Sequence, residues 1–109
     1  VLDAAPVVLR LDVPVPEEYS LSQNYPNPFN PETTIEYQLP EAGQVSLAVY
    51  HLLGQEVRSL VTGVQEAGYY AVQWDGRDSA GGEVSSGVYF YRLAVDGDYS
   101  KTMRMVLMK

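Results

Sequence analysis

Apolar and polar residues alternate along much of the chain after residue 32, which is the pattern of β-strands that bury one face. Residues 33–39 and 44–50 both alternate in this way, and a turn at residues 40–43, bounded by proline and glycine, separates them. Two such runs joined by a short turn favour a β-hairpin, so we expect these two segments to pair with each other.

Three further strands are predicted toward the C-terminus. Residues 67–75 alternate, and residues 87–95 are apolar on both faces apart from Arg92, which predicts a central strand buried on both sides. Asp96-Gly97 is a hairpin turn signal, and it introduces a final strand over residues 99–108. The spacing as a whole predicts about seven short strands, and therefore an all-β, immunoglobulin-like or fibronectin III-like antiparallel β-sandwich.

The segment between residues 49 and 60 has two interpretations. Its apolar residues recur at helical spacing, as on one face of a short amphipathic helix: Val49, Leu53, Val57 and Leu60. Gly54 stands in the middle of this segment, however, and would cost a helix about 1 kcal/mol. We therefore predict a strand, a turn at residues 53–56, and a second strand.

Proline and glycine divide the chain into two parts. All seven prolines lie at or before Pro40, and all nine glycines lie at or after Gly43. We interpret residues 1–19 as a linker or the last strand of a preceding domain, with residues 7–13 as the strand candidate, and residues 20–109 as the domain itself. We expect the chain to be the C-terminal piece of a longer precursor.

The motif Tyr-Pro-Asn-Pro-Phe-Asn-Pro occupies residues 25–31. Its three prolines exclude a helix or a central strand and favour extended backbone. Asn27 and Asn30 are placed to close Asx turns, and Phe29 is placed to insert into the core. We predict a rigid lead-in to the sandwich.

Charge and composition narrow the function classes. The chain has 14 acidic and 7 basic residues and a net charge of −7, which disfavours nucleic acid as a partner. Three of the basic residues, Lys101, Arg104 and Lys109, lie after Ser100, where there is no acidic residue. Cysteine is absent, so neither a disulfide nor a thiolate metal site can form.

Residues suited to catalysis or metal binding are scarce. His51 is the only histidine and has no partner motif, so we interpret it as a surface residue and expect no enzyme activity. A weak calcium-site candidate combines Asp75, Asp78 and Glu83, but Arg77 lies among them and the spacing is not that of an EF-hand loop. Backbone hydrogen bonds within a turn explain such acids better, so we expect no metal or other cofactor.

The chain is rich in aromatic residues, with nine tyrosines and one tryptophan. Exposed aromatic side chains on a sandwich would stack on sugar rings, which makes a carbohydrate-binding module one alternative. Five of these residues fall at predicted core positions, so we favour core packing: Tyr37, Tyr70, Trp74, Tyr89 and Tyr91.

Several short motifs, in order and at similar spacing, resemble the type A C-terminal sorting domain of the type IX secretion system. They are found at residues 25–35, 49–57, 74–78 and 86–93, then at Lys101 and residues 105–109. His51 departs from the family pattern, which usually has Asp there. The sequences Trp74-Asp75-Gly76 and Ser86-Gly87-Val88-Tyr89 also resemble the immunoglobulin-like part of flagellar hook-capping proteins.

The resemblance implies an immunoglobulin-like sandwich that follows an N-terminal cargo domain in an exported protein. Such a domain is read by the outer-membrane export machinery, then often removed by the signal-processing and attachment apparatus as the cargo is anchored at the cell surface. Carried over by position, the recognition residues would be Gly87, Val88, Tyr89, Lys101, Met105, Val106, Leu107 and Lys109.

The physical character of the last strand agrees with this implied role. An exposed final strand with a basic end would suit β-augmentation, in which a receptor strand pairs with its edge. An extended N-terminal arm together with an exposed edge also permits a homodimer by strand exchange. The alternatives are a structural or interaction module of immunoglobulin type and the carbohydrate-binding module described above.

Overall fold

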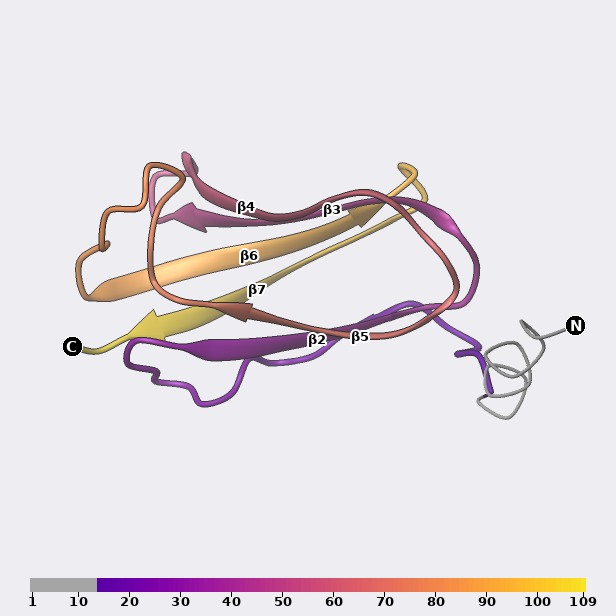
Figure 1. Ribbon diagram of the computed structural model, residues 1–109, viewed down its shortest axis with the longest axis horizontal. Coiled ribbons are helices and arrows are strands. Elements are labelled where there is room, and N and C mark those ends of the chain that lie inside the picture. Colours follow the sequence, from indigo (N-terminus) through magenta and orange to yellow (C-terminus); the bar gives the residue numbers. More distant parts are fainter. Residues whose placement is uncertain (1–13) are drawn as a thin grey trace, which may run out of the picture.

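Seven strands form two antiparallel sheets that pack face to face in the computed structural model, which describes residues 14–109 (Figure 1). One sheet has the strand order β1-β2-β5 and the other has the order β4-β3-β6-β7. The strands are β1 (Ser20–Leu21), β2 (Thr33–Leu39), β3 (Gly43–His51), β4 (Glu56–Gln65), β5 (Gly68–Trp74), β6 (Gly87–Val95) and β7 (Tyr99–Leu107). The predicted all-β sandwich is confirmed, while the predicted strand at residues 7–13 lies outside the described residues.

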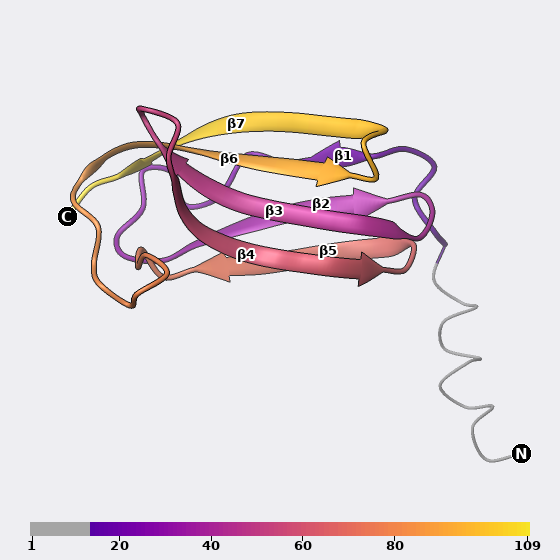
Figure 2. The same cartoon turned by 90° about the horizontal axis from the view of Figure 1, so that it is seen from above.

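The core lies between the two layers, which Figure 2 shows from above. Every second residue of β2 is buried, as are Val45, Leu47 and Val49 of β3, as the alternation predicted. The largest fully buried side chains include Trp74 and Tyr91. Each large apolar side chain buried in this way contributes about 1.5–3 kcal/mol. Burial of the alternating faces is therefore what holds the two sheets together.

The predicted hairpin between residues 33–39 and 44–50 is wrong. β2 pairs with β1 and β5, whereas β3 pairs with β4 and β6, so the turn between β2 and β3 carries the chain from one sheet to the other. An apolar face points inward equally well in a hairpin and in two opposed sheets, which is why alternation alone could not distinguish them.

The start of β3 is tied to the turn between β6 and β7 instead. The Asp96 carboxylate accepts a hydrogen bond from the Gln44 backbone N–H at 2.8 Å, and the Asp96 N–H donates to the Gln44 carbonyl at 3.0 Å. A Cβ atom at Gly43 would collide with this carboxylate, so the residue has to be glycine for the two segments to approach.

The strand over residues 87–95 is central in its sheet but is not buried on both sides. β6 lies between β3 and β7, and Tyr89, Tyr91, Leu93 and Val95 on its inner face are buried. The residues of its other face are half-buried, and Arg92 is exposed. A two-layer sandwich covers each sheet on one side only. The apolar residues on the outer face of β6 are therefore half-buried only through contacts with side chains of the neighbouring strands.

The strand–turn–strand interpretation of residues 49–60 is confirmed. β3 ends at His51 and β4 begins at Glu56, with Gly54 between them in a left-handed conformation of φ +89°. Such a backbone is accessible to glycine at little cost.

Within the described part of the chain there is no helix that could cross a membrane.

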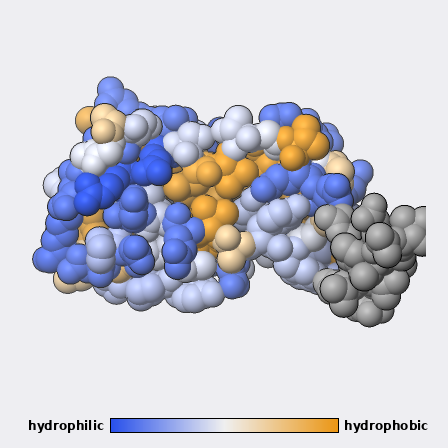
Figure 3. All heavy atoms as spheres, viewed as in Figure 1, coloured by the Kyte–Doolittle hydropathy of each residue, from blue (hydrophilic) through white to orange (hydrophobic). Residues whose placement is uncertain are grey.

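One side of the sandwich leaves apolar side chains partly uncovered. Figure 3 shows them between the edge strands β4 and β5. Val57, Leu60 and Val61 on β4 and Val72 on β5 pack against the core there but are only partly buried. The opposite side, next to β7, is closed by the segment between β1 and β2, residues 22–32, which contains the motif at residues 25–31 and which we call the lead-in from here on.

Candidate functional site

The final strand β7 is an edge strand. It pairs with β6 along its whole length, from Gly87 opposite Leu107 to Val95 opposite Tyr99. The predicted turn between them is confirmed: Asp96 and Gly97 have φ values of +52° and +77°, as a tight hairpin requires. The other side of β7 faces the lead-in and solvent.

The lead-in covers the C-terminal half of this edge. The Phe29 backbone N–H donates to the Val106 carbonyl, and the Phe29 carbonyl accepts from the Met108 N–H, both at 3.0 Å. Nearby, the Asn27 side-chain oxygen accepts from the Val106 N–H at 3.0 Å, and the Gln23 side chain donates to the Arg104 carbonyl at 2.8 Å. The predicted Asx turn at Asn27 is therefore wrong, because its oxygen binds β7.

Phe29 holds the lead-in in place, as predicted. Its side chain is 2% exposed, and its ring centre lies 5.7 Å from that of Trp74. Trp74 in turn meets Tyr89 edge-on at 5.7 Å. Since aromatic pairs in this geometry add about 0.5–1.5 kcal/mol beyond their burial, the three rings form the anchor between the lead-in and both sheets.

A second anchor, which sequence reasoning missed, is the hydroxyl of Tyr91. It accepts a hydrogen bond from the Asn24 N–H at 2.8 Å and donates to the Ser22 carbonyl at 2.7 Å. Burial raises the pKa of Tyr91 to about 12. Asn24 is itself buried, and its amide donates to Thr33 Oγ1 at 2.9 Å. No local pattern distinguishes Asn24 from the other polar residues of the lead-in.

The predicted recognition residues divide by exposure. Tyr89, Met105 and Leu107 belong to the core, so a partner of the folded domain cannot contact them directly. Gly87, Val88 and Val106 are half-buried, and the two lysines are exposed. Among these residues, only Lys101 and Lys109 offer a charged side chain to a partner.

The two lysines lie far apart and in different surroundings. Lys101 and Lys109 are separated along an extended segment, by roughly 25 Å at the usual rise of a strand. Lys109 is held at the end of the sandwich, where its N–H donates to Ser86 Oγ at 3.0 Å and its Nζ lies 3.3 Å from Glu83. Lys101 has no such contact among the described residues.

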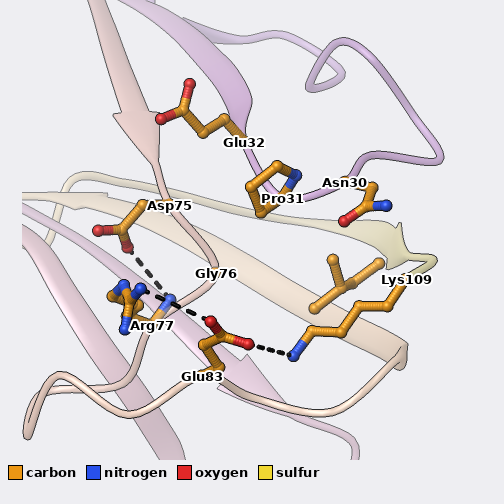
Figure 4. A pocket seen from close by; sticks show the side chains of 9 residues that line it. Asn30, Pro31, Glu32, Asp75, Gly76, Arg77, Glu83 and Lys109 are labelled. Carbon is orange, nitrogen blue, oxygen red and sulfur yellow. Dashed lines mark hydrogen bonds and ion pairs between the residues drawn. The ribbon is translucent and has the colours of Figure 1, made fainter.

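A pocket of about 480 Å³ lies beside Lys109 (Figure 4). Its lining includes Pro31 from the lead-in and Asp75, Arg77 and Glu83 from the segment between β5 and β6. Glu83 lies between two cations, 3.6 Å from the Arg77 guanidinium and 3.3 Å from Lys109 Nζ. This ion-pair network joins the C-terminal end to the loop and pairs both cations that line the pocket.

The three acids of the calcium candidate do not come together. Asp75 accepts from the Arg77 N–H at 3.1 Å and lies 3.4 Å from the Arg58 guanidinium. Asp78 accepts from the N–H groups of Ala80 and Gly82, which is the turn role that the sequence favoured. Within residues 14–109, no three potential ligands form a metal-binding group.

His51 and the five aromatic residues assigned to the core serve the fold. The His51 ring accepts a hydrogen bond from the Leu53 N–H at 3.0 Å, and its other nitrogen lies 2.9 Å from the Gln55 side-chain oxygen, both within the β3–β4 turn. Of the aromatic residues assigned to the core, four are buried and one is half-buried, which confirms core packing: Tyr37, Trp74, Tyr89 and Tyr91, then Tyr70.

Comparison with known families identifies the kind of domain. Residues 29–102 match the model of the FlgD Ig-like domain family, which is well over half of the chain. The chain belongs to this FlgD Ig-like family. Its members share the immunoglobulin-like fold described above. No curated protein sequence matches the chain.

Two solved structures contain a similar fold. One is dimeric latent PorU from Porphyromonas gingivalis, with 17% identity and a TM-score of 0.66 over 84% of this chain. The other is PorZ of the same bacterium, an essential surface component of its type IX secretion system, with 21% identity and a TM-score of 0.55 over 85% of this chain. The chain spans only 9% and 12% of those proteins, and at these identities the likeness concerns the fold.

Proposed function

We propose that this FlgD Ig-like domain is a C-terminal sorting domain of the type IX secretion system. It directs an N-terminal cargo domain across the outer membrane and toward attachment at the cell surface. Its partners are the outer-membrane export machinery and the apparatus that processes and attaches the cargo. We assign it no catalytic activity and no cofactor.

One observation carries this proposal. The two ends of the sorting-domain resemblance, the motif at residues 25–31 and the ending at residues 105–109, are brought together by hydrogen bonds between Phe29, Asn27 and the end of β7. Segments that far apart in the sequence form one continuous surface. A receptor that reads the folded domain would meet both at once.

The comparisons support the same proposal at the level of fold. An immunoglobulin-like module of this shape occurs within PorZ, a surface component of a type IX system. Because the present chain corresponds to a small fraction of PorU and PorZ, a role as one module of a larger exported protein is consistent with them. A secreted or cell-surface location follows from the proposed role.

Within this proposal the predicted recognition residues have two kinds of task. Lys101 and Lys109 contact the export machinery, because they are exposed and charged. The other six shape the hairpin that presents them, through core packing or through the β6–β7 pairing: Gly87, Val88, Tyr89, Met105, Val106 and Leu107.

The test is surface display. The full 109-residue chain is fused behind a periplasm-directed fluorescent reporter in a bacterium with a working type IX system, and surface fluorescence is compared with the translocon present and deleted. We expect translocon-dependent display that falls when Lys101 and Lys109 are both replaced by glutamine. The control is Arg58→Gln, which also neutralises a cation, but one that lies on β4 and is half-buried beside Asp75.

A second function is favoured by the family match, which covers residues 29–102 and stops before the C-terminal half of β7. It is a structural or interaction module that needs no export signal. In that case the intact, folded fusion stays in the periplasm whether the translocon is present or not, and the sorting proposal is wrong.

A further inference from the structure

The edge of β7 has an open half as well as a covered one. The outward backbone groups of Arg104, Val106 and Met108 bond to the lead-in. Because a strand repeats every two residues, the N–H and C=O groups of Ser100 and Thr102 point the same way. No described residue bonds to those groups. We call residues 99–103 the open half of the β7 edge, because its outward backbone groups are unpaired, although the Tyr99 ring itself stacks on Tyr19 at 4.9 Å.

Unpaired positive charge gathers around this open half. Residues 14–109 contain six basic side chains, and three of them, Arg58, Arg77 and Lys109, form the ion pairs of the described structure. The other three have no acidic partner there and lie on the paired strands β6 and β7: Arg92, Lys101 and Arg104. In a protein of net charge −7, this concentration of positive charge is a distinct local feature.

The register places these cations around Thr102. Arg92 is directly opposite Thr102 on β6, and its Nε donates to Ser100 Oγ at 2.9 Å. Arg104 is two residues further along β7, on the same face as Thr102. Lys101 extends from the other face of the strand, so cations flank the backbone on both faces over residues 101–104, whereas the acidic Asp98 directly precedes the open half.

Lys101 also determines which strand can pair here. Its position in β7 is on the core-facing side, yet the residue is exposed. A neutral strand added to this edge would bury the ammonium group without an acidic partner, which costs free energy. For this reason, inward-pointing charges on edge strands oppose pairing with unspecific partners. A strand with acidic side chains would pair the charge instead.

We propose that the open half of the β7 edge binds an extended acidic strand of a partner protein by β-augmentation. The backbone of Ser100 and Thr102 supplies the pairing, and Arg92, Lys101 and Arg104 supply the preference for acid. The inference rests on the proposed sorting function for the cellular identity of the partner, which is then a component of the export machinery.

Another long edge provides an internal control. β5 is also an edge strand, and its sequence, Gly-Tyr-Tyr-Ala-Val-Gln-Trp, has no basic residue. β4 is less suitable, because its pairing with β3 has two register shifts and Ser79 already donates to the Val57 carbonyl at 3.0 Å. A strand that recognises backbone alone would therefore choose β5 at least as readily as β7.

The experiment uses the 109-residue protein and a synthetic peptide of about eight residues in which pairs of glutamates alternate with pairs of valines, so that both faces of the extended peptide carry acid. The same peptide with lysine in place of glutamate is the charge control. Backbone amide exchange is followed by NMR. We expect the glutamate peptide to slow exchange at Ser100 and Thr102, and the lysine peptide to leave it unchanged.

Two sets of variants test the mechanism. Thr102→Pro removes an outward N–H and should abolish peptide binding without unfolding the domain, because that N–H has no partner inside the sheet. Ala71→Pro is the matched control, since its N–H faces the free edge of β5, and it should bind the peptide normally. The triple variant Arg92→Gln, Lys101→Gln, Arg104→Gln should bind about tenfold more weakly.

In the peptide experiment, either of two results overturns the inference. One is equal protection of Ala71 and Gln73 on β5, which would mean pairing without charge selection. The other is no protection of the Ser100 and Thr102 amides from exchange by the glutamate peptide, which would mean that Lys101 only prevents strands from pairing with this edge. If the Thr102→Pro fusion is still displayed on the surface, the inference fails while the sorting function stands. If the unsubstituted fusion is not displayed on the surface, the proposed sorting function is wrong, irrespective of the result of the peptide-binding experiment.

Discussion

The two halves of β7 belong to one strand with one unbroken register, yet they differ in what lies beside them. The C-terminal half is bonded to the lead-in through Gln23, Asn27 and Phe29. The N-terminal half, residues 99–103, has its outer backbone free of bonds from the described residues. Whether a strand edge is available for pairing therefore depends on the distant chain segments that cover it and not on the strand alone.

The covered half also links the two ends of the domain. The lead-in passes from β1 in one sheet, past the Tyr91 hydroxyl, to the end of β7 in the other sheet. Its contacts close one side of the sandwich, whereas the side between β4 and β5 stays open. Stability is therefore expected to depend on the covered half, and partner binding on the open half.

The largest expected effect comes from removing the aromatic anchor of the covered half. Phe29→Ala should destabilise the domain by about 3–5 kcal/mol, because the ring is fully enclosed against Trp74. It should also speed amide exchange at Val106 and Met108, which bond to the lead-in. Urea unfolding and NMR exchange measure the two effects.

The matched variant for Phe29→Ala is Leu93→Ala, which also removes a fully buried side chain but leaves the lead-in contacts in place. It should lower the stability by about 2–5 kcal/mol without selectively exposing Val106. If both variants change exchange at Val106 equally, the covered half is not a separate unit.

Next in size is loss of the Tyr91 hydroxyl. Tyr91→Phe should cost about 1–3 kcal/mol in urea unfolding, because the buried Asn24 N–H and Ser22 carbonyl lose their partner. Tyr70→Phe removes a hydroxyl that donates to the exposed Glu66 carbonyl, and should cost less. An equal cost for the two would show that the lead-in bonds are replaced by water.

Alkaline pH should lower the stability of the domain, in part through deprotonation of Tyr91. Burial raises the pKa of Tyr91 from 10.0 to about 12, and burial also raises that of Tyr37 to about 12. The folded state therefore holds these protons more tightly than the unfolded state. The stabilisation is complete below about pH 10 and is lost as the pH rises to about 12.

Urea unfolding between about pH 9 and pH 12 measures this loss. Tyr91→Phe removes one of the two groups, so its stability should fall less steeply over the same range. An unchanged slope would mean that Tyr91 titrates alike in the folded and unfolded states.

The smallest expected effects on stability come from single polar side chains, one beside each half of the β7 edge. Asn27→Ala should cost about 0.5–1.5 kcal/mol, because the Val106 N–H loses a partner. Thr102→Ala, in the open half, should change stability by less than about 0.5 kcal/mol. Equal costs in urea unfolding would contradict the distinction between the halves.

Local chemistry was enough to predict most strands, the turn at Gly54, the hairpin at Asp96-Gly97 and the insertion of Phe29. Each of these depends on neighbours in sequence: alternation selects a buried face, glycine permits a left-handed turn, and prolines keep a segment extended. The acids at Asp75 and Asp78 were assigned to turns for the same reason, and they bond nearby N–H groups.

The choice of partners was decided only in three dimensions. Alternation does not say whether two inward-facing strands pair or oppose each other, so β2 and β3 were wrongly joined in a hairpin. Nor does it show that Asn27 bonds to Val106, or that Tyr91 holds Asn24, because those contacts span 79 and 67 residues. Whether an edge is covered or open is a property of such long-range contacts, and it is this property that separates the two halves of β7.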